Sequence, residues 1–195
     1  MIEIFAKKFS RWIISKTGDD TRYDILVYGA ECFISEVIAN LVLFLFAFVF
    51  NIPIYTLVWL IGFLLSRIWF GGYHAKSHFL CIVYSTIIGI LCVQISLGLP
   101  ASFFMLPVEI VPGLLTAFSI TPVTHPHHPI SSKQRRIFAH RSRLFALLIS
   151  GTILFLFISR QFVYAHLLGM GLLSSTVLCW IGFFCHRFRR KQTPN

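Results

Sequence analysis

The run Ala39-Asn-Leu-Val-Leu-Phe-Leu-Phe-Ala-Phe-Val-Phe50 carries no charged residue and closes an apolar segment that extends over residues 25–50. A helix needs about 17–25 apolar residues to cross the hydrocarbon core of a bilayer, so this segment is long enough to span it. Five more apolar segments follow, at 54–69, 79–99, 103–118, 144–159 and 162–184. The second, fourth and fifth of the six hold only 16 residues each, so they could be short, tilted or re-entrant. Pro107, Glu109 and Pro112 make the fourth the weakest of these spans.

The composition excludes a soluble globular protein. Of the 195 residues, 56% are hydrophobic and only 12% are charged, whereas soluble domains carry about 25% charged residues. Phenylalanine alone supplies 21 residues, and a single core of this size cannot bury so much apolar surface. We therefore predict one all-α integral membrane domain over 1–195, with about six transmembrane helices, some of them short or re-entrant, in a bundle over 25–184.

The net charge of +10 is explained by membrane topology. With a cytoplasmic N-terminus, the segments on the inner side are 1–24, 67–78, 119–143 and 185–195. These hold 16 of the 17 Lys and Arg residues, and only Arg160 lies outside them. The positive-inside rule predicts this asymmetry, so the charge implies no nucleic-acid partner. We expect a multi-pass cell-membrane protein with both termini, including the basic tail 185–195, in the cytoplasm.

The N-terminal segment 1–20 has the pattern of an amphipathic helix. Its apolar residues recur at helical spacing, and its basic residues lie on the other side: Ile2, Phe5, Phe9, Trp12 and Ile13 against Lys7, Lys8, Arg11 and Lys16. Such a helix lies in the headgroup region of a bilayer, although a solvated leader helix fits the same pattern. No signal-peptide cleavage site is recognisable, and Thr21 with Asp24 resembles a capping box for the next helix.

Metal and cofactor signatures are absent from the sequence. The five cysteines are an odd number without a C-x-x-C pair, which argues against a disulfide framework or a thiolate zinc site. There is no phosphate-binding loop, no H-E-x-x-H and no G-x-S-x-G. His125, His127 and His128 lie between prolines with no carboxylate or thiolate nearby in sequence, so solvated histidines fit better than a metal cluster. We predict no metal and no cofactor.

One stretch combines groups suited to nucleophilic catalysis: Arg67-Ile-Trp-Phe-Gly71-Gly72-Tyr73-His74-Ala-Lys76-Ser77-His78-Phe-Leu-Cys81. Gly71 and Gly72 are typical of a helix end and a tight turn. Ser77 is a good N-cap for a helix that begins at His78, which leaves Cys81 about one turn inside it. The positive end of the helix dipole and the nearby Arg67 favour the thiolate of Cys81.

Two histidines could act as the base for Cys81. His78 lies three residues before Cys81 on a continuous helix, whereas His74 would be about 10 Å away in rise. His74 reaches Cys81 only if the Gly-Gly turn folds it back over the helix start. From spacing alone, a packing cysteine and a solvated loop histidine are the more common arrangement.

These motifs resemble the accessory gene regulator B (AgrB) family of bacterial membrane peptidases. The family pattern appears here as Arg67, Gly71, Gly72, His74 with Ala75, and Cys81 seven residues after the histidine. The basic, proline-rich segment 121–136 and the stretch Tyr28-Gly29-Ala-Glu31 are also similar, although the family has an Asn or a basic residue where this chain has His-Pro-His-His-Pro. The resemblance covers nearly the whole chain.

The resemblance implies a cysteine endopeptidase that acts on an AgrD-like precursor peptide with an acidic C-terminal tail. By this match Cys81 is the nucleophile and His74 the base. Cys81 would release the tail and hold the signal segment as a thioester, which a Cys or Ser of the substrate then takes over to close a thiolactone or lactone ring. The family also suggests a homodimer.

Supporting roles are open at several residues. Arg67 could bind the acidic tail or stabilise the thiolate, or it could simply reach the membrane interface. Lys133, Arg135 and Arg136 would suit the acidic tail, although topology alone also places them in the cytoplasm. Glu31 and Glu36 lie about 140° apart on a helix, so they form no carboxylate pair. One of them could orient His74, with Glu31 as our candidate, or both could be hydrated near the inner boundary.

Two other functions compete with the peptidase. A small peptide transporter or exporter would use Arg67 and Glu31 as its polar path, and a purely structural membrane partner would need neither. Replacement of Cys81 separates an enzyme from a transporter.

Overall fold

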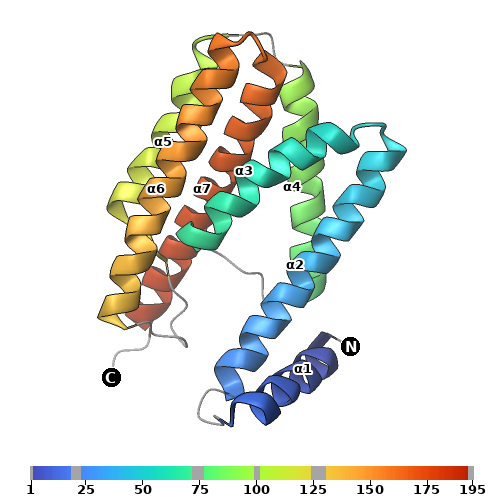
Figure 1. The fold of residues 1–195 in the computed structure, drawn as a ribbon, viewed down its shortest axis with the longest axis vertical. Helices are drawn as coiled ribbons and strands as arrows, with labels where there is room; N and C mark the ends of the chain where they lie inside the picture. Colours follow the sequence, from blue (N-terminus) through green and yellow to red (C-terminus); the bar gives the residue numbers. More distant parts are fainter. Residues whose placement is uncertain (1, 19–22, 72–76, 99–101, 124–130, 193–195) are drawn as a thin grey trace.

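Seven helices form the part of the chain that the computed structural model describes, residues 2–18, 23–71, 77–98, 102–123 and 131–192 (Figure 1). For Thr17, His78 and residues 186–192 only the backbone is described. The helices are α1 (Ile2–Thr17), α2 (Tyr23–Val49), α3 (Pro53–Phe70), α4 (His78–Gly98), α5 (Met105–Ser119), α6 (Ser132–Ile158) and α7 (Phe162–Gln192). These described ranges contain no strand, and the predicted all-α membrane fold is confirmed.

Five of the helices, α2, α3, α4, α6 and α7, are long and apolar enough to cross a membrane. The 15 residues of α5 rise about 22 Å, less than the roughly 30 Å of a hydrocarbon core, and α5 continues through Pro112. α6 begins well before the predicted apolar segment 144–159, because its first turns are basic and escape a search for apolar residues. Its start is a capping box, in which Ser131 N donates to Gln134 Oε1 (3.0 Å) and Gln134 N donates to Ser131 Oγ (3.2 Å).

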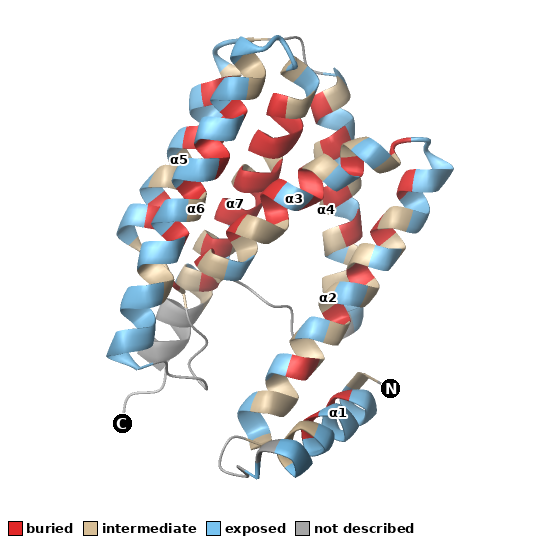
Figure 2. Ribbon diagram, viewed as in Figure 1, coloured by how far each residue is buried: buried red, intermediate tan, exposed pale blue. Residues whose placement is uncertain are grey.

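α7 lies at the centre of the bundle and packs against α3, α4, α5 and α6. Buried residues follow α7 and the face of α3 that meets it (Figure 2). The two backbones approach closely at glycines: a Cβ at Gly62 would lie 2.6 Å from Leu168 O, and one at Gly171 would collide with Trp59 O. Any larger side chain would push α3 away from α7, so these glycines set the position of α3.

The outer surface of the bundle is apolar. Large hydrophobic side chains such as Phe48, Leu91 and Phe155 are at least half exposed. In water this would be costly, whereas lipid chains cover such a surface without penalty. The exposed residues therefore agree with a membrane-embedded bundle.

α1 packs along α2 through the buried residues Ala6 and Ser10. The side chains of Ile4, Phe5, Phe9 and Trp12 point away from the protein and are exposed. An exposed apolar stripe beside a basic one fits the predicted amphipathic helix; its position in the headgroup region stays a prediction.

The alternating direction of the helices brings the starts of α2, α4 and α6 and the ends of α3 and α5 to one end of the bundle (Figure 1). The described parts of the four cation-rich segments therefore share this end. That it faces the cytoplasm stays a prediction.

Candidate functional site

The nucleophile predicted from the sequence lies in the first turn of a helix. α4 begins at His78, as the Ser77 cap predicts, and Cys81 N donates to Ser77 O (3.0 Å). The Cys81 side chain is half-buried. The unpaired N–H groups of a first turn give this end of the helix a partial positive charge.

Two predicted site residues, Gly72 and His74, lie outside the described residues, and so do the three histidines of the proline-rich loop that were expected to be solvated. The capping box proposed at Thr21 also falls there. The role of His74 as base therefore stays a prediction.

Gly71 ends α3 in a conformation that only glycine adopts readily, with φ 72° and ψ −153°. Val123, which follows α5, runs alongside it: Val123 N donates to Phe70 O (3.0 Å), and a Cβ at Gly71 would collide with Val123 O. Cys179 of α7 also donates its S–H to Phe70 O (3.6 Å). The end of α3 is thus held by contacts from two distant parts of the chain.

Arg67 connects this turn to the nucleophile. Its Nη1 donates to Gly71 O (3.0 Å), and its guanidinium interacts electrostatically with Glu36 and Cys81. A positive charge at this place can stabilise a thiolate, the oxyanion of an acyl-transfer intermediate, or a carboxylate of a substrate.

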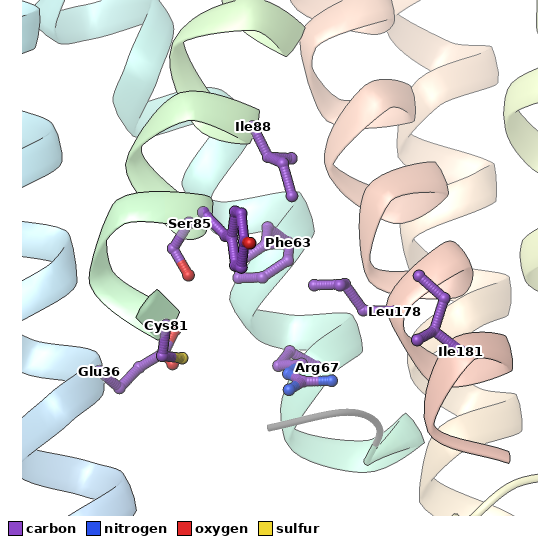
Figure 3. A pocket seen from close by; sticks show the side chains of 9 residues that line it. Glu36, Phe63, Arg67, Cys81, Ser85, Ile88, Leu178 and Ile181 are labelled. Carbon is purple, nitrogen blue, oxygen red and sulfur yellow. The ribbon is translucent and has the colours of Figure 1, made fainter. Parts of the chain in front are cut away.

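A cavity of about 220 Å³ opens between α2, α3, α4 and α7, and Cys81 is part of its wall (Figure 3). Its lining residues are Glu36, Phe63, Arg67, Cys81, Tyr84, Ser85, Ile88, Leu178 and Ile181. Figure 3 shows Glu36 and Cys81 at one end, Arg67 across from them on α3, and Ile88 farther along α4. The site is therefore a pocket with charged groups near the sulfur and apolar walls beyond.

The carboxylate in this pocket is Glu36. Glu31, the predicted orienting carboxylate, does not line the cavity, and its charge acts on Lys7 of α1. Cys32 lies one turn before Glu36 on the same face of α2 and is also close enough to Cys81 to interact with it electrostatically. Leu178 and Ile181 of α7 had no sequence signal, because they reach the site only through tertiary packing.

The predicted tail-binding cations Lys133, Arg135 and Arg136 are exposed in the first turns of α6, outside the cavity. α6 contacts the last turn of α3, because Arg141 lies over the Trp69 ring, 5.0 Å from its centroid. Phe145 stacks on the same ring at 5.4 Å.

A second polar cluster was missed in the sequence. Glu109 Oε1 of α5 and His166 Nδ1 of α7 are 2.9 Å apart and share a hydrogen bond, with both side chains at most 2% exposed. Glu109 Oε2 and His166 Nε2 have no hydrogen-bond partner among the residues that the structure describes. Both residues lie near the start of their helices, at the opposite end of the bundle from Cys81. Two ionisable residues in apolar segments were the available signal, since each needs a partner.

Within the described ranges, no group of three or more His, Cys, Asp or Glu side chains could hold a metal ion.

Comparison with known proteins gives a consistent answer. The family profile "Accessory gene regulator B" (AgrB) matches residues 6–183. A "Putative AgrB-like protein" of Clostridium perfringens (strain SM101 / Type A) is 29% identical over 191 residues, covering 91% of this chain and 85% of the relative. "Putative AgrB-like protein 2" of C. perfringens (strain 13 / Type A) is 27% identical over 149 residues, 70% of this chain and 67% of the relative. No solved structure gives a significant match.

Proposed function

This chain belongs to the accessory gene regulator B family, and from that premise we propose that it is a membrane cysteine endopeptidase. Membership supports a part in the processing of quorum-sensing peptides. The substrate we propose is an AgrD-like precursor with an acidic C-terminal tail. The observation that carries the proposal is the position of Cys81, in the first turn of α4, on the wall of a cavity that also contains Arg67.

The proposed reaction has two acyl transfers. The Cys81 thiolate attacks the carbonyl carbon before the tail, the C–N bond breaks, and the leaving amine takes a proton from the imidazolium of His74. A thiol or hydroxyl of the signal segment then attacks the Cys81 thioester, which closes the ring and releases Cys81. Exchange of a thioester for a thiolactone is nearly isoenergetic, so ring closure needs no ATP. Burial at the membrane edge would protect the thioester from water.

The other charged residues receive roles in the same proposal. Arg67 would stabilise the thiolate or the oxyanion. Lys133, Arg135 and Arg136, exposed at the same end of the bundle, would attract the acidic tail. Glu31 stays our proposed orienting group for His74. We further propose that this end faces the cytoplasm and that the protein works as a homodimer.

The test uses the full chain in proteoliposomes with an AgrD-like precursor, and mass spectrometry of the products. We expect Cys81→Ala to lower cleavage by more than about 1,000-fold and to remove the acyl-enzyme adduct. Cys92→Ala is the matched control, because Cys92 lies on the same helix, packs against the core and does not line the cavity.

Cleavage that survives Cys81→Ala would overturn the proposal. Uptake of intact precursor by that variant, without cleavage by the parent protein, would favour a transporter. A product that is only linear would refute ring closure while leaving the peptidase assignment in place.

A further inference from the structure

The lining of the cavity beside Cys81 indicates which substrate side chain it accepts, an inference that rests on the proposed peptidase function. In the acyl-enzyme the Cα of the acylated residue is only two bonds from Cys81 Sγ. The side chain of that residue must therefore lie within a few ångströms of the sulfur. Because Cys81 is itself part of the cavity wall, this side chain is the substrate group best placed to enter the cavity.

The walls beyond the sulfur are mostly apolar, apart from the hydroxyl groups of Tyr84 and Ser85. Phe63 of α3, Ile88 of α4 and Leu178 of α7 offer only carbon atoms to an occupant (Figure 3). A charged side chain would lose its hydration there and gain at most a hydroxyl partner, whereas an apolar side chain would gain from leaving water.

The two charges of the cavity stand at the end near the sulfur. Glu36 lies beside Cys81, and Arg67 lies across from both on α3 (Figure 3). Ile88 lies seven residues beyond Cys81 along α4, a rise of about 10 Å, so the cavity extends well beyond the sulfur.

The volume of the cavity further limits which side chains can occupy it. At about 220 Å³ it is smaller than the roughly 300–1,000 Å³ of sites for drug-sized ligands. It is too small for a folded peptide, and a small side chain such as alanine would leave most of it empty. One bulky aliphatic or aromatic side chain fits both the volume of the cavity and its mostly apolar lining.

We propose that this cavity is the specificity pocket of the peptidase, and that it selects precursors with a bulky apolar residue immediately before the scissile bond. The proposal thus specifies one residue of the substrate, the residue whose carbonyl carbon is transferred to Cys81.

Four precursors that differ only at this position, carrying Phe, Leu, Ala or Asp, test the pocket with the full chain in proteoliposomes. We expect kcat/KM for Leu and Phe to exceed that for Ala by at least about tenfold, with Asp cleaved more slowly still. A flat profile, or a preference for Ala or Asp, would overturn the pocket assignment.

Filling the cavity provides the second arm. Leu178→Trp should lower kcat/KM for the Phe and Leu precursors by about tenfold or more while largely sparing the Ala precursor. Val177→Trp is the matched control, because Val177 is the preceding residue of α7 and is 49% exposed on the outer surface. An equal loss for all four precursors in Leu178→Trp, with normal activity of Val177→Trp, would contradict the proposal.

The two proposals fail in different ways. If no precursor is cleaved in a Cys81-dependent manner, the peptidase function itself is wrong. If cleavage depends on Cys81 but ignores the residue before the scissile bond, the peptidase stands and only the specificity pocket is wrong.

Discussion

Two polar clusters lie at opposite ends of the bundle, and they differ in the space around them. Near the starts of α5 and α7, Glu109 and His166 share a hydrogen bond, and both side chains are almost fully buried. Near the start of α4, Cys81 and Arg67 line an open cavity together with Glu36. Ionisable residues in apolar helices occur in both places, so their presence alone does not mark a site of chemistry. The two clusters differ in accessibility: Glu109 and His166 are almost fully buried, whereas Cys81 and Arg67 line an open cavity that a substrate could enter.

Among variants that retain Cys81, the largest effect should come from removing the charge of Arg67. Arg67→Gln loses the hydrogen bond to Gly71 O and the positive charge beside Cys81. Hydrogen bonds to charged groups contribute about 1.5–3 kcal/mol, so kcat/KM for precursor cleavage should fall about 10- to 100-fold. Rates are compared per folded molecule after gel filtration in detergent.

Arg143→Gln serves as the control for Arg67, because Arg143 is exposed and lies over the Phe118 ring. It should retain nearly full activity. Equal losses in both variants would show that general basicity, and not the place of Arg67, matters for cleavage.

The second-largest effect should come from a substitution at Gly71, whose carbonyl oxygen accepts the hydrogen bond from Arg67. Gly71→Ala forces a side chain into a conformation that costs about 1–3 kcal/mol and into contact with Val123 O. The turn should shift, with a loss of cleavage of about tenfold and a lower midpoint of thermal unfolding. Gly151→Ala on α6, where a Cβ meets open space, should change neither measurement. Full activity of Gly71→Ala would mean that this turn does not position the site.

Substitutions in the buried Glu109–His166 pair should change the stability of the protein and not its rate of catalysis. Glu109→Leu leaves His166 Nδ1 buried without its partner, which should lower the free energy of unfolding by about 1–3 kcal/mol. The double variant with His166→Leu removes both polar groups and should regain part of that loss. Thermal unfolding in detergent measures stability, and kcat/KM per folded molecule should be unchanged. A selective fall in kcat would show that the Glu109–His166 pair contributes to catalysis at Cys81 and would contradict a purely structural role for the pair.

The smallest effect is expected at the exposed ion pair of α1. The hydrogen bond from Lys7, followed by its charge, holds the pKa of Glu3 below its usual range. Any stabilisation is therefore present above the unfolded pKa of about 4.3 and is lost as the pH falls through the lower folded pKa. Because both groups are exposed, Glu3→Gln should leave the unfolding midpoint at pH 7 unchanged within error. A shift as large as that of Glu109→Leu would indicate a buried environment for α1.

Helix positions were predictable because each depends on neighbouring residues. The boundaries of α2, α3, α4 and α5 lie within about two residues of the predicted segments, since apolar length, Gly71 and Ser77 act locally. The capping-box pattern of Ser131 and Gln134 also marks the early start of α6, but apolar length does not detect it because the first turns are polar.

The membrane class and the candidate nucleophile followed from the sequence alone, since apolar length and the pattern around Cys81 are local properties of the chain. The choice of Glu36 over Glu31 as the carboxylate beside Cys81 was decided by how α2 is rotated against α3 and α4. The apolar walls from α7 and the pairing of Glu109 with His166 required the full bundle. These contacts join residues far apart in sequence, and close packing of helices, which no local pattern encodes, determines which of them meet.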